Sequence, residues 1–457
     1  MSKELLFKML SHKDTNGEVP WVPFVGVHAG KLKGYTAEEV LKDGDKLYES
    51  LIEANKLYVP DGLPVLFDLQ VEAEILGCDL YWAKDNPPSV KSHPLANEKR
   101  IPCKCKIPNK ESGRIPMILD VMSRIKKEIG ESVALYGLIC GPFTLASHLR
   151  GSDIFMDMVT DSNYVSELLE FCGEVACKMA EMYIDAGMDV IAIVDPLVSQ
   201  ISPRHIDKLL APTFTAVFDY IRSKGAYSCF FVCGNATKQI ESMCKLNPDC
   251  ISIDENVNMA EAKKITEKYN ITIGGNIPLT TTMLFGSQQD NMKAVIDILD
   301  SVEHKNLIVS PGCDMPYDIP IENTIAAAQA VKTPEQIREV IKNYESDSFA
   351  DIEIDIPEYE NLDKVLIEIF TLDPDQCAAC TYMVNLVADN YNEIKDIADY
   401  KVYKYNIKED IARTAKMGIK NLPTLCVNGE QKWISIIPNK EEFVNEIKTV
   451  YKNKVRR

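Results

Sequence analysis

Two cysteines stand where apolar segments of this sequence end. Residues 227–235 read Tyr-Ser-Cys-Phe-Phe-Val-Cys-Gly-Asn, a short aromatic and β-branched run with Cys233 near its end. Residues 307–316 repeat the arrangement with Cys313. If both runs are strands of one parallel barrel, their carboxyl ends face the same mouth and the two thiols point into one cavity. Two thiols there are half of a soft-metal site, although free cysteines are as often small buried hydrophobic residues.

A second cysteine pair, Cys377 and Cys380, forms a Cys-x-x-Cys motif near the end of the chain. The motif follows an apolar run at 364–370 and precedes a helical pattern at 381–397. A helix N-terminus lowers the pKa of a thiol placed there, so this position favours redox chemistry at Cys377. A zinc half-site is the alternative.

Other polar residues follow the remaining apolar runs: His28, Asp68, Asp195, Asp254 and Asn276. In a barrel, all of these positions face one mouth, which is the catalytic face of that fold. Their shared location argues for a site more strongly than any one of them. Each aspartate taken alone is equally well explained as the cap of the helix that follows it.

The elements that position these residues alternate between strand and helix. The alternation predicts an α/β fold, a (β/α)8 TIM barrel over residues 1–345, with eight strands that begin at Trp21–Val27. A doubly wound open sheet has the same local pattern and is the alternative. The segment 79–117 breaks the rhythm, and we expect a β-rich insertion over the mouth. Its Cys103-Lys-Cys105 has no second pair at metal-binding spacing and indicates a packing or surface feature.

The end of the chain forms a second predicted domain. Residues 346–360 are acidic and predict a linker, and residues 361–457 have the order βαβαββα. That order, the Cys-x-x-Cys motif and Pro423 before an apolar strand resemble the thioredoxin–glutaredoxin family. The resemblance implies a small thioredoxin-like domain in which Cys377 and Cys380 are the redox pair and Pro423 is a cis-proline beside it.

Composition restricts the partners. The 457 residues are enough for two domains, and the net charge of −18 argues against nucleic acid, whose phosphates need clustered Lys and Arg. No apolar stretch is long enough to span a membrane, and the first ten residues lack the apolar core of a signal peptide. We therefore expect a cytoplasmic protein whose fourteen cysteines are mostly reduced.

Several motifs of the large domain resemble the uroporphyrinogen decarboxylase superfamily. They are the segments 137–146, 67–77, 232–235 and 310–316. The two cysteines are similar to those of the branch that moves methyl groups from methylated corrinoid proteins to thiols such as coenzyme M. That branch binds zinc through His-x-Cys and a distant Cys, which implies Cys233 and Cys313 as ligands. Phe231 stands where the histidine is expected, so Cys229, on the same strand face, or His28 would have to replace it.

The resemblance implies a methyltransferase with zinc at the mouth. A corrinoid protein would be the partner, because the chain lacks the corrinoid-binding Asp-x-His-x-x-Gly pattern. A small-molecule thiol would be the methyl acceptor, oriented by Asp68, His28 or Asp195, and the redox domain would keep thiols reduced. One alternative is a metal-free decarboxylase centred on Asp68, although residues 27–31 lack that enzyme's arginines. The other is a non-catalytic thiol- or corrinoid-binding protein.

Overall fold

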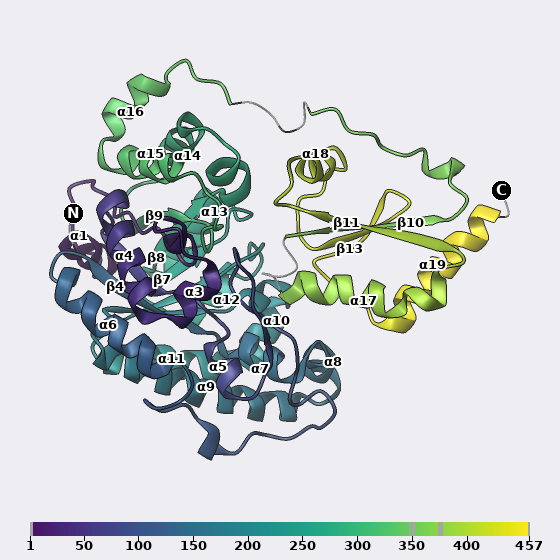
Figure 1. Ribbon diagram of the computed structural model, residues 1–457, viewed down its shortest axis with the longest axis horizontal. Helices are drawn as coiled ribbons and strands as arrows, with labels where there is room; N and C mark the ends of the chain where they lie inside the picture. Colours follow the sequence, from purple (N-terminus) through teal and green to yellow (C-terminus); the bar gives the residue numbers. More distant parts are fainter. Residues whose placement is uncertain (1–2, 347–348, 350–351, 373–377, 456–457) are drawn as a thin grey trace. The chain divides into compact units, whose positions relative to one another are not determined.

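The chain folds into two compact units, Met1–Tyr344 and Glu345–Arg457 (Figure 1). The computed structural model describes residues 3–346, 349, 352–372 and 378–455. The acidic segment expected to be a linker therefore groups with the C-terminal unit. None of the helices in these described residues is long and apolar enough to cross a membrane.

The first unit is built around a curled parallel sheet of seven strands in the order β1-β4-β5-β6-β7-β8-β9. Its strands are β1 (Gly62–Leu66), β4 (Ala134–Cys140), β5 (Val190–Val194), β6 (Tyr227–Val232), β7 (Cys250–Ile253), β8 (Thr272–Ile277) and β9 (Leu307–Pro311). Nearly all of their residues are buried, as both faces of a covered parallel sheet require. The fold is thus consistent with a TIM-like barrel, and each strand carries its next loop to the same end of the sheet.

The predicted first strand, Trp21–Val27, is wrong as an element. Only Trp21 makes a parallel bridge, to Val309 of β9, and the chain then turns into α2 (His28–Lys31). Pro23 has no N–H group to extend the ladder. The short contact still links the sheet edges, because Val22 N donates to Val309 O and Asp61 N, next to β1, donates to Trp21 O, at 3.0 and 2.9 Å.

Helices follow the strands as the sequence pattern predicted from residue 118 onward (Figure 1). The principal ones are α4 (Gly44–Tyr58), α6 (Ile115–Ile129), α7 (Pro142–Arg150), α8 (Asp153–Thr160), α9 (Ser162–Asp185), α11 (Ala211–Ser223), α12 (Ile240–Lys245), α13 (Met259–Thr266), α14 (Gln288–Ser301), α15 (Ile321–Lys332) and α16 (Pro334–Ile341). The single helix expected near 154–187 is broken at Asp161, whose side chain accepts from Tyr164 N and caps α9.

The insertion at 79–117 contains less β structure than expected. Two short strands, β2 (Leu80–Tyr81) and β3 (Ser89–Val90), pair with each other, and a 3₁₀ turn covers Lys104–Lys106. Cys103 and Cys105 are joined by a disulfide at the exposed edge of this turn.

The barrel interior is filled by large apolar side chains. Phe24, Phe67, Tyr136 and Phe231 belong to one buried cluster. Helix α1 (Lys3–Leu10) adds Leu6, Met9 and Leu10 to the same cluster. The inside of the curled sheet is therefore a packed core, which leaves the rim at the strand ends as the place for a site.

The second unit has the order β10-α17-β11-α18-β12-β13-α19, the βαβαββα order read from the sequence. Its elements are β10 (Val365–Thr371), α17 (Ala378–Ile394), β11 (Ala398–Lys404), α18 (Lys408–Lys416), β12 (Thr424–Val427), β13 (Glu430–Ile434) and α19 (Lys440–Val455). The sheet order is β11-β10-β12-β13, with β10 parallel to β11 and antiparallel to β12. The bond Leu422–Pro423 is cis, as expected. Cys380 is buried in the first turn of α17, whereas Cys377 lies outside the described residues.

A buried ion pair holds the end of the acidic segment against this unit. Arg413 donates to Glu368 at 2.5 Å, and both side chains are almost fully buried. Tyr359 donates to the same carboxylate at 2.6 Å, and Arg413 also donates to the carbonyl of Asp355 at 2.8 Å. Residues 355–359 are therefore tied to the second unit by polar contacts.

Candidate active site

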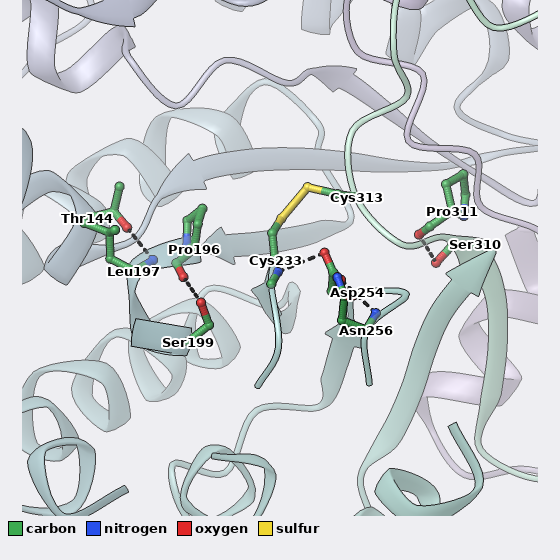
Figure 2. The surroundings of a disulfide bond; sticks show 11 residues. Thr144, Pro196, Leu197, Ser199, Cys233, Asp254, Asn256, Ser310, Pro311 and Cys313 are labelled. Carbon is green, nitrogen blue, oxygen red and sulfur yellow. Dashed lines mark hydrogen bonds between the residues drawn. A yellow bond between two sulfur atoms is a disulfide. The ribbon is translucent and has the colours of Figure 1, made fainter. Parts of the chain in front are cut away.

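The carboxyl ends of β6 and β9 bring Cys233 and Cys313 together, and we call them the thiol pair (Figure 2). Their sulfur atoms are bonded in this structure, and their Cα atoms are 6.0 Å apart. Both residues are partly exposed and pack on the top of the apolar barrel core. The expectation that these two thiols share one location is therefore confirmed.

The end of β7 holds the loop that carries Cys233. The N–H of Gly234 donates to Asp254 Oδ2 at 2.8 Å, and Asp254 Oδ1 accepts from the backbone and side chain of Asn256 at 2.9 and 2.6 Å (Figure 2). Gly234 has φ +82°, a conformation that favours glycine. Asn276 donates to the carbonyl of Asp254 at 3.0 Å. Asp254 and Asn276, both expected at the mouth, thus position backbone beside the thiol pair.

The ends of β7 and β8 support the loop that carries Cys313. Gly312 donates its N–H to Ile277 O at 3.0 Å. A Cβ atom on Gly312 would lie 2.7 Å from the backbone nitrogen of Glu255, so only glycine fits there. Asp254 and Glu255 of one turn therefore contact the neighbours of both cysteines.

The residues around the thiol pair do not complete a metal site. Three protein ligands are usual for a catalytic zinc, and the described residues contain no group of three His, Cys, Asp or Glu side chains that could hold a metal. Phe231 fills the expected histidine position and packs against Phe24 and Phe67, with ring centroids 4.7 and 5.9 Å away. Two thiols alone do not fit the zinc centre that the resemblance implied.

Neither proposed substitute ligand reaches the thiol pair. Cys229 lies four residues below Cys233 on β6, about 13 Å along a strand, and its sulfur contacts Ser252 Oγ at 3.5 Å. His28 is fully buried, and its ring nitrogens are bound to Tyr317 O at 2.9 Å and to Tyr58 Oη at 2.7 Å. Burial lowers the pKa of His28 to about 4, so the ring is neutral and is engaged at both nitrogens.

Asp195 is fully buried at the end of β5 and caps α7, the helix that follows β4. Its carboxylate accepts from Phe143 N at 2.9 Å and from Thr144 Oγ1 at 2.6 Å, in the first turn of α7. Burial raises its pKa to about 7 in spite of these hydrogen bonds. Asp195 thus caps a helix across the strand end, and both of its carboxylate oxygens accept hydrogen bonds from the first turn of that helix.

Asp68 follows β1 and is paired with Arg114 at the start of α6. The two charged groups are 2.7 Å apart, and the Asp68 side chain has no exposed surface. Asp68 Oδ1 also accepts from Gln70 N at 2.9 Å. Arg114 in addition binds Glu74 at 2.8 Å. The Asp68 carboxylate is therefore held by Arg114 and by the backbone of Gln70, and its charge also contributes to the raised pKa of Asp314, the residue after Cys313.

Three further acids at the same end of the sheet have raised pKa values. Burial raises the pKa of Glu72 and of Glu255 to about 8, and it raises the pKa of Asp314 well above its usual range. Asp314 lies beside Cys313, and Gly26 must lack a side chain because a Cβ there would overlap Asp314. Asp314 could have been found from its place next to Cys313. Glu72 is on a helix, and no pattern in the sequence marks it.

The fold and this rim define a class: an α/β protein with a curled parallel sheet and a bonded cysteine pair at the carboxyl ends of two strands. The uroporphyrinogen decarboxylase (URO-D) model matches residues 1–334, and the chain belongs to this family.

Relatives of this chain include methyltransferases and uroporphyrinogen decarboxylases. The chain is 28% identical over 337 residues to methylcobamide:CoM methyltransferase MtbA of Methanosarcina acetivorans, covering 72% of this chain and 97% of the relative. It is 27% identical over 270 residues to methylcobamide:CoM methyltransferase MtaA of Methanosarcina barkeri, covering 57% and 76%. Uroporphyrinogen decarboxylase of Prochlorococcus marinus is 23% identical over 302 residues, covering 64% and 84%.

A solved structure has the same fold. A methyltransferase from Methanosarcina mazei superposes with a TM-score of 0.66 at 21% identity, covering 73% of this chain and 98% of that one. At this identity the likeness supports the fold of the first unit alone.

Proposed function

We propose that the first unit transfers a methyl group from a methylated corrinoid, carried by a separate protein, to a small thiol bound at the rim of the sheet. The observation that carries the proposal is the convergence of Cys233 and Cys313 at the ends of β6 and β9. The names of the relatives support it, since two of them are methylcobamide:CoM methyltransferases. A metal-bound acceptor is not assigned, because the donor set around the pair is incomplete.

In this proposal the reduced thiol pair prepares the acceptor. A thiol attacks a methyl group as its thiolate, so the acceptor must give up a proton. One cysteine of the pair, ionised to its thiolate, takes this proton and becomes a thiol. Because the ordinary pKa of cysteine is near that of other alkyl thiols, this proton transfer is close to balanced. The apolar core below the pair, which includes Phe231, keeps water away from one side of the acceptor.

Turnover with defined reagents tests the proposal. The full chain, kept reduced without oxygen, is supplied with free methylcobalamin and a panel of thiols that includes coenzyme M. We expect methylated thiol, detected by mass spectrometry, and loss of at least 100-fold in rate for Cys233→Ser, within the range for removal of a general base. Cys177→Ser, remote from the rim, is the matched control. Unchanged turnover in Cys233→Ser refutes the role of the pair.

Decarboxylation through Asp68 has less support in the geometry. Its carboxylate is paired with Arg114 and has no exposed surface, and Lys31, where the decarboxylase has an arginine, forms an ion pair with Asp318. The non-catalytic alternative is tested by the same assay, because a binding protein would produce no methylated thiol with any acceptor.

For the second unit we propose a thioredoxin-like role that keeps thiols reduced. Its strand order, its helix α17 that begins within the Cys-x-x-Cys motif and its buried Cys380 support the proposal. Cys377→Ser in the full chain should leave methyl transfer intact under strong reductant and lower it after mild oxidation. Equal sensitivity of the variant and the parent to oxidation contradicts this role.

A further inference from the structure

Cys233 and Cys313 meet without a third metal donor in the described residues. We propose that the thiol pair is a reversible dithiol–disulfide couple, a thiol-exchange site in the place where the family resemblance implied zinc. Its substrates are low-molecular-weight thiols and disulfides or a protein dithiol. The existence of this couple is independent of the proposed function, whereas the claim that the couple controls turnover rests on the proposed function.

The two backbones hold the sulfur atoms at bonding distance without a change of fold. Cα atoms 6.0 Å apart lie inside the range that a disulfide requires. Each cysteine is fixed from a different strand, and the turn at Asp254 and Glu255 braces both loops. Both sulfurs can therefore form and break one bond while the flanking strands stay in place.

The surroundings favour the couple over a metal. A disulfide offers no thiolate ligand, and the reduced pair offers only two. Phe231 closes the side where a third donor would stand, and Phe24 and Phe67 extend this apolar wall. Partial exposure of both cysteines leaves the bond open to attack by an external thiolate.

The exchange is balanced by two external thiols. A thiolate attacks one sulfur of the Cys233–Cys313 bond, that bond breaks, and the other cysteine leaves as a thiolate that takes up a proton. A second external thiolate then attacks the mixed disulfide and releases the remaining cysteine. The pair gains two electrons, and one external disulfide is formed.

Differential alkylation of the full chain tests the couple. Free thiols are blocked with N-ethylmaleimide in denaturant, so that buried thiols react as well. Disulfides are then reduced, and the newly exposed thiols are labelled with the deuterated reagent before peptide mass spectrometry. After treatment with oxidised glutathione, we expect heavy label on Cys233 and Cys313, and after dithiothreitol we expect light label on both. Cys229 should carry light label throughout, and the exposed Cys103–Cys105 pair reports whether the reagents act.

The metal content of the reduced chain tests the opposing possibility, that the thiol pair holds zinc. We expect the reduced chain to hold far less than one zinc per chain. About one zinc per chain in the reduced protein, lost in Cys233→Ser, overturns the proposal, because a zinc centre would then occupy the pair. Failure of the two cysteines to become linked while Cys103 and Cys105 do so overturns it as well.

The same samples separate this inference from the proposed function. If the oxidised chain is inactive and dithiothreitol restores methyl transfer, the couple controls the site. Equal turnover of both forms refutes this control and leaves the methyltransferase proposal standing. A reversible couple in a chain that transfers no methyl group under any condition refutes the proposed function and leaves the couple standing.

Discussion

Phe231→His restores the residue that the family resemblance places two positions before Cys233. If the missing donor is what excludes zinc, this one change should create a zinc site with Cys233 and Cys313. Phe231 lies in β6, and Cys233 follows the last residue of that strand and packs against the same core cluster. Residues two apart on an extended chain point to one side, so the new ring would stand on the side of the thiol pair. The pair must be reduced, since a disulfide cannot ligate metal.

The structure sets the magnitude of the effect. Phe231 is fully buried and contacts Phe24 and Phe67, so replacing it with a polar ring should lower the free energy of unfolding by about 3 kcal/mol, the low end for loss of a large buried aromatic side chain. The buried His28 has its pKa lowered to about 4, and a histidine in this core should also be neutral at pH 7, the form that binds metal. Zinc at about 100 times its Kd would restore about 2.7 kcal/mol.

The assay is thermal unfolding of the reduced chain with zinc and with a chelator, together with metal content. We expect Phe231→His to melt below the parent in chelator and to recover most of the loss in zinc, with about one zinc per chain. Phe231→Leu and Phe231→His with Cys313→Ser should not respond to zinc. A zinc response in the parent, or none in Phe231→His, refutes the reasoning.

Three further predictions concern buried charges and the braces of the thiol pair. The pKa of Glu72 is raised from 4.5 to about 8 in the folded state, so the native state holds an extra proton between these two pH values and the protein loses stability as the pH rises through them. Glu72→Gln should remove this loss and stabilise the first unit at pH 9 by about 1–3 kcal/mol, measured by urea unfolding. A steeper dependence of stability on pH in the variant contradicts this prediction. Asp254→Asn leaves a backbone N–H of the loop that carries Cys233 without its acceptor, so it should slow formation of the Cys233–Cys313 disulfide by about tenfold, which equals about 1.4 kcal/mol in the barrier. An unchanged rate of disulfide formation contradicts this prediction. Arg413→Met strands the buried Glu368 carboxylate and should destabilise the second unit by about 3–5 kcal/mol, measured by limited proteolysis of the full chain, whereas adding Glu368→Gln should recover most of the loss.

The sequence by itself determined the elements of both units. Buried parallel strands such as β5 and β6 are short, apolar and β-branched or aromatic, and this local pattern needs no knowledge of distant residues. The same local logic placed Cys233 and Cys313 at strand ends, and parallel strands bring such ends to one rim. The strand predicted at 21–27 failed because one proline removes the donor that would continue the ladder, a local signal that the apolar run outweighed.

Only the tertiary structure decided what the polar residues at the rim do. Asp68 and Asp195 follow strands as the sequence predicted, whereas His28 begins the helix α2. The partners of all three lie far along the chain: Tyr317 for His28, Arg114 for Asp68 and Thr144 for Asp195. Each partner engages a side chain that a substrate or a metal would otherwise contact. Which side chain is engaged and which is open depends on side-chain packing between elements distant in sequence, and a one-dimensional pattern does not contain those distances.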